Sequence, residues 1–103
     1  MIIYNVTSQV APEIVEEWIV WMQDSFIPNV LESDYFKEIH ILKVHLDENS
    51  DPTYAIQYKS DSEELVQNYL VEKAPQDKVE IRKRFGDQVL FFETRLELIS
   101  AHK

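Results

Sequence analysis

The sequence predicts an α+β fold of the ferredoxin-like type, a βαββαβ sandwich with a four-stranded antiparallel sheet and two helices on one face. Hydrophobic residues alternate over residues 2–10, 37–47, 53–59 and 88–98, which is the period of a strand. They recur every three to four residues over 13–31 and 62–84, which is the period of a helix. A chain of 103 residues has room for one domain, which we expect to span 1–103.

The first strand separates apolar from polar side chains, and the first helix follows it directly. One face of the strand is apolar, with Ile2, Tyr4, Val6 and Val10, and the other carries Ile3, Asn5, Thr7 and Gln9. Pro12 suits the first turn of the helix. A helical wheel gathers the apolar residues on one broad arc: Ile14, Val15, Trp18, Ile19, Trp21, Met22 and Phe26. Pro28 is expected to kink or end this helix.

The two central strands are joined by a polar hairpin at residues 47–52. In the first of them, one parity holds Phe36, His40, Leu42, Val44 and Leu46, and the other holds Ile39 and Ile41. This mixture indicates either burial on both faces or a bulge near Ile41 and Leu42. The next strand sets Tyr54, Ile56 and Tyr58 against Ala55 and Gln57.

The second helix has recognisable start and stop signals. Two overlapping capping boxes, Ser60 with Glu63 and Asp61 with Glu64, place its start near Ser62. Pro75 is expected to divide it, and Gly86, the only glycine, to end it. The last strand then carries Leu90, Phe92, Leu96 and Leu98 on one face, and Val89, Phe91, Glu93, Arg95 and Glu97 on the other.

Both faces of the predicted sheet carry apolar residues, although two helices can cover only one of them. We assign to the second face Ile3, Ile39, Ile41, Ala55, Val89 and Phe91. An antiparallel sheet with one solvated face shows cleaner alternation than this. A second copy of the chain is the most economical cover, so the sequence predicts a homodimer joined through the helix-free face.

The composition excludes several classes of partner. The formal charge is −9, and no Lys or Arg precedes Lys37. Nucleic acids and anionic membranes are bound through broad basic surfaces, so neither is expected as a partner. No cysteine is present, and no apolar run reaches the ~20 residues of a membrane span. We therefore expect a soluble, cytoplasmic protein.

No motif for metal, nucleophilic or phosphate chemistry is present. His40 and His45 are five residues apart, so a regular strand points them to opposite faces. The loop after His45 lacks the glycine and distal glutamate of a calcium loop, and no serine lies in a nucleophile motif. A single glycine cannot build a phosphate-binding loop. The sequence therefore predicts neither a metal nor a cofactor.

Two groups of residues remain as site candidates. A cavity between sheet and helices would be lined by Tyr4, Asn5, Trp18, Met22, His40 and Tyr58. The alternative for these residues is an ordinary filled core. A second, polar group lies in mid-strand and serves either a pocket or an interface: Asn5, Thr7, Gln57, Glu93 and Arg95.

Several short segments resemble a short bacterial family known only as a domain of unknown function. They are Met1 to Thr7, Glu17-Trp18, Trp21-Met22, residues 27–31, Tyr54 to Tyr58, Ala74-Pro75 and residues 85–87. Members of that family often have His-Ile-Pro and His-Ala-Pro where this chain has Phe26 and Lys73 before the same dipeptides. More distantly, the pattern is similar to the dimeric α/β-barrel superfamily, which includes cofactor-free monooxygenases, isomerases and stress-response proteins.

Two functional hypotheses follow from these observations. The first is a non-enzymatic homodimer, with a small apolar or aromatic ligand between helices and sheet. The second, which the superfamily resemblance implies, is a small cofactor-independent oxygenase- or isomerase-like enzyme with His40, Asn5 and Tyr58 in its pocket. A cavity on which these groups converge would favour the enzyme, and a filled core would favour the first hypothesis.

Overall fold

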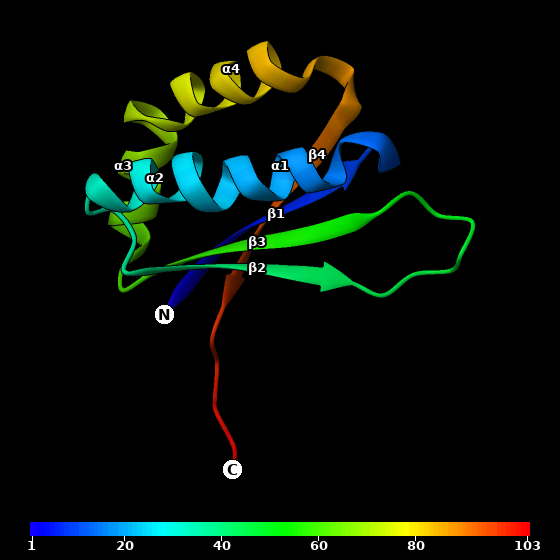
Figure 1. Ribbon diagram of the computed structural model, residues 1–103. Coiled ribbons are helices and arrows are strands. Elements are labelled where there is room, and N and C mark those ends of the chain that lie inside the picture. Colours follow the sequence, from blue (N-terminus) through cyan, green and yellow to red (C-terminus); the bar gives the residue numbers. More distant parts are fainter.

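The computed structural model describes residues 1–103 and has the predicted architecture (Figure 1). Four strands form one antiparallel sheet in the order β2-β3-β1-β4: β1 (Ile2–Val10), β2 (Glu38–Val44), β3 (Thr53–Ser60) and β4 (Val89–Glu97). Figure 1 shows all the helices on one side of this sheet, with the other side uncovered. The ferredoxin-like α+β fold is therefore confirmed.

The first helical region continues past its proline instead of ending there. It comprises η1 (Pro12–Ile14), α1 (Val15–Trp21), η2 (Met22–Phe26) and α2 (Ile27–Glu32), where η1 is a 3-10 turn and η2 is a π-helix. The Ile27 N–H donates to the Met22 carbonyl, five residues back. Pro28 has no N–H to donate to a carbonyl of the preceding turn. The wider π turn, η2, lies directly before Ile27 and Pro28. The expected kink or end at Pro28 is therefore replaced by a change of helix type.

The second helical region divides at Pro75 as predicted. α3 (Glu63–Glu72) is capped by Ser62, whose side chain accepts a hydrogen bond from the Leu65 N–H at 3.1 Å. α4 (Ala74–Phe85) ends at Gly86, whose φ of +57° is costly for any residue with a Cβ. A 3-10 turn, η3 (Gly86–Gln88), leads into β4.

The core between helices and sheet is aromatic. Four rings pack together with centroid separations of 4.8 to 6.5 Å: Tyr4, Phe36, Tyr58 and Tyr69. Trp18 is 1% exposed and its ring lies 5.2 Å from that of Tyr54. Pairs at such distances add to the free energy gained by burying apolar area.

The strand faces are as predicted for β1 and β3 and reversed for β2 and β4. Ile39 is paired with Tyr58, and Ile41 with Ile56, so both face the helices. Val89 is paired with Val10, and Phe91 with Ser8, which also face the helices. The opposite parity therefore lies on the helix-free face, with His40, Leu42 and Val44 from β2 and Leu90, Phe92 and Leu96 from β4.

Both reversals have a physical cause. The pairing of β2 with β3 runs without interruption through Ile41 and Leu42, so no bulge resets the faces there. In β4 the charged parity faces the helical side, because its side chains reach partners at the edge of that layer. Glu93 pairs with Lys78 at 2.6 Å, and Arg95 pairs with Glu63 of α3. Apolar Leu90 and Phe92 are left on the open side.

Candidate functional site

The helix-free face of the sheet carries large apolar side chains exposed to solvent. Their exposed fractions range from 42% to 63%, for Leu42, Leu90, Phe92 and Leu96. Leu90, Phe92 and Leu96 lie on one edge strand, β4, and Leu42 lies on the other, β2. Single exposed apolar side chains need no explanation, but several of them on one face indicate an interaction surface. Only Glu38 and Lys59 are charged among the strand residues that face this side.

A polar row crosses the middle of the same face on all four strands. It consists of residues paired from strand to strand, His40 with Gln57, Gln57 with Asn5, and Asn5 with Thr94. Asn5 is 9% exposed, and its Nδ2 donates to the hydroxyl oxygens of Thr7 and Thr94 at 3.2 and 3.3 Å. Its Oδ1 is buried without a partner. A buried acceptor left unpaired costs about 1–3 kcal/mol, so the row is not a complete hydrogen-bond network within one chain.

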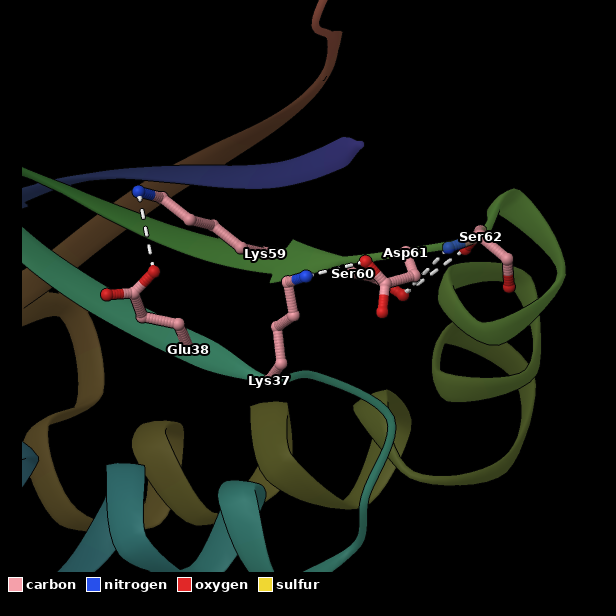
Figure 2. A network of polar contacts seen from close by, with 6 residues as sticks. All are labelled: Lys37, Glu38, Lys59, Ser60, Asp61 and Ser62. Carbon is pink, nitrogen blue, oxygen red and sulfur yellow. Dashed lines mark hydrogen bonds and ion pairs between the residues drawn. The ribbon is translucent and has the colours of Figure 1, made fainter.

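One end of the face is lined by ion pairs (Figure 2). Glu38 of β2 points across to Lys59 of β3, with 3.8 Å between the two charged groups. Next to it, Lys37 contacts Asp61 at 2.7 Å. His40 Nε2 lies 2.8 Å from the second oxygen of Glu38, and this hydrogen bond is the main reason that the pKa of Glu38 lies below its ordinary value. The charges on this face are therefore balanced locally.

The other end of the face holds an apolar groove of about 430 Å³. Five of its eight lining residues are hydrophobic, among them Val44, Leu46, Leu90 and Phe92. Thr7, another lining residue, also accepts one of the two hydrogen bonds from Asn5. The groove has the volume and apolar lining of a typical ligand pocket, but it is open to solvent on an exposed face.

The expected cavity between sheet and helices is filled by the residues predicted to line it. Tyr4, Trp18, Met22 and Tyr58 are 1% to 4% exposed and belong to one packed core. Burial holds the pKa of Tyr4 and Tyr58 well above that of a free tyrosine. Hollows of 260 to 440 Å³ lie elsewhere on the molecule, and none of them is lined by these four residues.

The prediction that His40 and Asn5 join that cavity is wrong. Asn5 faces away from the helices, and His40, paired with Gln57, lies on the same helix-free face. Tyr58 is therefore separated from both by the sheet itself. The constellation of His40, Asn5 and Tyr58 that an oxygenase- or isomerase-like pocket would need does not converge.

The second predicted group is divided between the two faces. Thr7 and Gln57 lie with Asn5 on the helix-free face, as expected. Glu93 and Arg95 lie on the other side, where Arg95 also donates to Gln67 at 2.9 Å. Sequence reasoning placed Leu90 and Phe92 in the core and omitted Thr94. Leu90, Phe92 and Thr94 are two residues apart along one strand, so they share a face, and the polar Thr94 was the available sign that this face is not the core.

The two positions at which this chain departs from the family it resembles, Phe26 and Lys73, line one hollow of about 260 Å³. Lys73 donates to the Asn29 side chain at 2.9 Å and pairs with Asp77 at 3.1 Å. Buried Asp77 also accepts a 2.6 Å hydrogen bond from Tyr69. The polar groups here satisfy one another and tie α2 to α4, which is a structural arrangement.

The described residues contain no cluster of three or more His, Cys, Asp or Glu side chains placed to hold a metal ion. None of the helices combines the length and the apolar character needed to cross a membrane.

The sequence matches a family model over residues 1–99, and the model is described as a domain of unknown function, DUF4286. The chain belongs to the DUF4286 family. This confirms the resemblance drawn from its short sequence segments. Among curated proteins, no sequence matches this DUF4286 chain.

Solved structures with the same fold have very different sequences. An ethyl tert-butyl ether degradation (EthD) family protein of Bacillus halodurans has a TM-score of 0.63 and 12% identity, covering 95% of this chain and 100% of its own. A proposed antibiotic biosynthesis monooxygenase of Deinococcus radiodurans has a TM-score of 0.60 and 13% identity, covering 100% and 97%. The protein At3g17210 of Arabidopsis thaliana has a TM-score of 0.57 and 22% identity, covering 96% and 99%. At these identities the likeness concerns the fold alone.

Proposed function

We propose that this DUF4286 chain acts as a non-enzymatic homodimer whose two helix-free sheet faces pack against each other. The observation that carries the proposal is the combination of exposed Leu42, Leu90, Phe92 and Leu96 on a face with no net charge. A chain of formal charge −9 repels its own copies through most of its surface. The helix-free face is suited to self-contact because its only charged strand residues, Glu38 and Lys59, neutralise each other.

The dimensions of the monomer support the same proposal. A compact monomer of 12.2 kDa exposes about 6,100 Å² and a chain of this length has a radius of gyration of about 13 Å. This chain exposes 6751 Å² and has a radius of gyration of 14.0 Å. A two-layer fold with one uncovered face exposes more surface than a compact monomer of the same mass. Packing two such faces together would bury the excess.

A small apolar ligand between helices and sheet would have to displace the rings of Tyr4, Trp18 and Tyr58, which already fill that space. The enzyme hypothesis would need His40 and Tyr58 on the same side of the sheet, whereas strand pairing puts them on opposite sides. Both considerations favour a self-associating protein over a catalyst or a binder in the core.

Substitution of an exposed residue on the proposed interface tests this function directly. Phe92→Asp should produce a monomer at concentrations where the wild-type chain dimerises, because it places an unpaired carboxylate in an apolar contact. Its fold should be retained, since Phe92 is 63% exposed in the single chain. Sedimentation equilibrium measures the mass of each variant.

The matched control is Val71→Asp, which introduces the same charge at an exposed apolar position of α3, on the helical side. It should leave the dimer intact. If both variants dissociated equally, or if neither dissociated, the proposal that the helix-free face is the contact surface would be wrong.

A further inference from the structure

The chain continues beyond β4 as an extended segment whose side chains are largely exposed in its own copy. The Leu98 N–H still bonds to the Met1 carbonyl at 3.0 Å, and after it no regular structure follows. Ile99 is 85% exposed, more than any other large hydrophobic residue, and Leu98 is 51% exposed. In Figure 1 this segment, drawn in red, runs away from the helical layer. We call residues 98–103 the tail.

The apolar groove on the helix-free face, with the loop beside it, matches the tail in hydrophobicity and charge. It is lined by Val44, Leu46, Leu90 and Phe92, and Leu46 leads into the hairpin loop. That loop is acidic, with Asp47, Glu48 and Asp51, whereas the tail has no acidic residue and includes His102 and Lys103. The tail thus has both the apolar side chains and the charge that the groove and its border would accept.

The tail cannot reach the groove of its own copy. The groove adjoins Leu90 at the start of β4, and the tail begins at Leu98, about 27 Å further along the strand direction. Residues 99–103 can span at most about 18 Å even when fully extended, so they do not reach the groove of their own copy. Only a second copy can supply a tail to this groove.

The residues of β4 that face the open side, together with the first tail residue of the same parity, form a pattern that is symmetric about Thr94. Along the chain they are Leu90, Phe92, Thr94, Leu96 and Leu98. A two-fold axis lying along the polar row, which includes Thr94, reverses the strand direction of the second copy. Leu96 then lies over Phe92 of the other copy, and Leu98 lies over Leu90. Apolar residues meet apolar residues along the whole strand.

We propose that, in the homodimer proposed above and on which this inference rests, the tail of each copy lies in the groove of the other. Leu98 and Ile99 pack against Leu90 and Phe92, and the basic end of the tail lies beside the acidic hairpin loop. The two-fold axis runs along the polar row, so Asn5 of each copy, with its unpaired Oδ1, lies at the centre of the interface.

Paramagnetic broadening between copies tests this placement, because the chain has no cysteine of its own. A nitroxide is attached to Ser100→Cys in unlabelled chains, which are mixed with ¹⁵N-labelled wild-type chains. Broadening can then arise only between copies. The amide signals of Leu46 and Leu90 should be broadened strongly, and that of Val79 on α4 should not. Broadening confined to residues near Glu38 and Lys59 would mean that the strands of the two copies run in the same direction, with the tail over β2 of the other copy, and would overturn the inference.

A second measurement separates this inference from the dimer itself. Leu98→Asp should raise the dimer dissociation constant at least about tenfold, which corresponds to about 1.4 kcal/mol, because it places an unpaired carboxylate in an apolar contact. Val71→Asp should not change it. A wild-type dimer whose dissociation constant is unchanged by Leu98→Asp, with no broadening at the groove, would overturn the tail placement and leave the dimer standing. A wild-type chain that sediments as a monomer would overturn the proposed dimer.

Discussion

Single side chains connect distant parts of this fold where polar groups are buried. Asp77 is buried in α4 and is bonded on one oxygen by the Tyr69 hydroxyl and on the other by Lys73. Because Lys73 also bonds Asn29, three helices meet through this one carboxylate. A buried carboxylate is tolerated only with such a complete set of partners.

Tyr69→Phe should lower the free energy of unfolding by about 1.5–3 kcal/mol. It removes the 2.6 Å hydrogen bond to Asp77 and leaves one oxygen of a buried carboxylate unpaired. Chemical denaturation monitored by circular dichroism measures the loss. Tyr54→Phe, which keeps the ring that packs on Trp18, is the control and should cost less. An equal loss in both variants would show that the hydrogen bond to Asp77 contributes nothing specific.

The ion pair between Lys37 and Asp61 predicts a pH dependence. The Lys37 ammonium, 2.7 Å away, holds the pKa of Asp61 below its usual range. A lowered folded-state pKa means that the pair stabilises the fold above the unfolded pKa of about 3.9, and that this contribution is lost as the pH falls through the folded pKa. In Lys37→Met the Asp61 carboxyl should titrate at higher pH, which carboxyl NMR detects. Lys83→Met removes the same charge from α4 and should leave the titration of Asp61 unchanged.

At the scale of the elements, local signals located the helix ends but not the orientation of the outer strands. The start of α3 and the break at Pro75 depend on residues close in sequence, so both positions could be predicted, although the capping residue is Ser62 and not the predicted Ser60 or Asp61. Which parity of β2 faces the helices depends on pairing with β3, and both parities of β2 are apolar. His40 was therefore placed on the wrong face. The charge of Glu38, which shares its parity, was the signal that could have corrected this.

The turn from α4 to β4 depends on the backbone of one residue. Gly86 has φ +57° and ψ −133°, and a Cβ built there would meet no atom within 4 Å. Gly86→Ala should therefore destabilise the fold through backbone strain alone, by about 1–3 kcal/mol. Thermal unfolding compares it with Gln88→Ala, an exposed change in the same turn that should cost little. A Gly86→Ala variant as stable as the wild type would contradict the strained backbone conformation.

At the scale of the whole molecule, the sequence predicts more of the architecture than of the site. The alternating periods defined the sheet, and the presence of apolar residues on both faces predicted a partner. The identity of the residues on the open face was partly wrong, since β2 and β4 are reversed. The reason for predicting a homodimer is unchanged, because apolar residues on the helix-free face still need to be covered. These residues include Leu90 and Phe92 instead of Ile39 and Phe91.

The tail and the symmetric pattern of β4 belong to this largest scale as well. The tail has no role within one copy, because it contacts no groove of its own chain. The pattern of β4 is centred on the polar row, in which Asn5 is incompletely hydrogen-bonded within one copy. Both acquire a role when two copies pack with their strands reversed. The dimer, and not the single chain, is therefore the functional unit that we propose.

The mass of the wild-type chain in solution tests this account most directly. Sedimentation equilibrium at micromolar concentration should give twice the 12.2 kDa of one chain, with a dissociation constant that Phe92→Asp raises and Val71→Asp does not. A mass of 12.2 kDa at that concentration, in a chain whose circular dichroism shows it to be folded, would contradict the central claim.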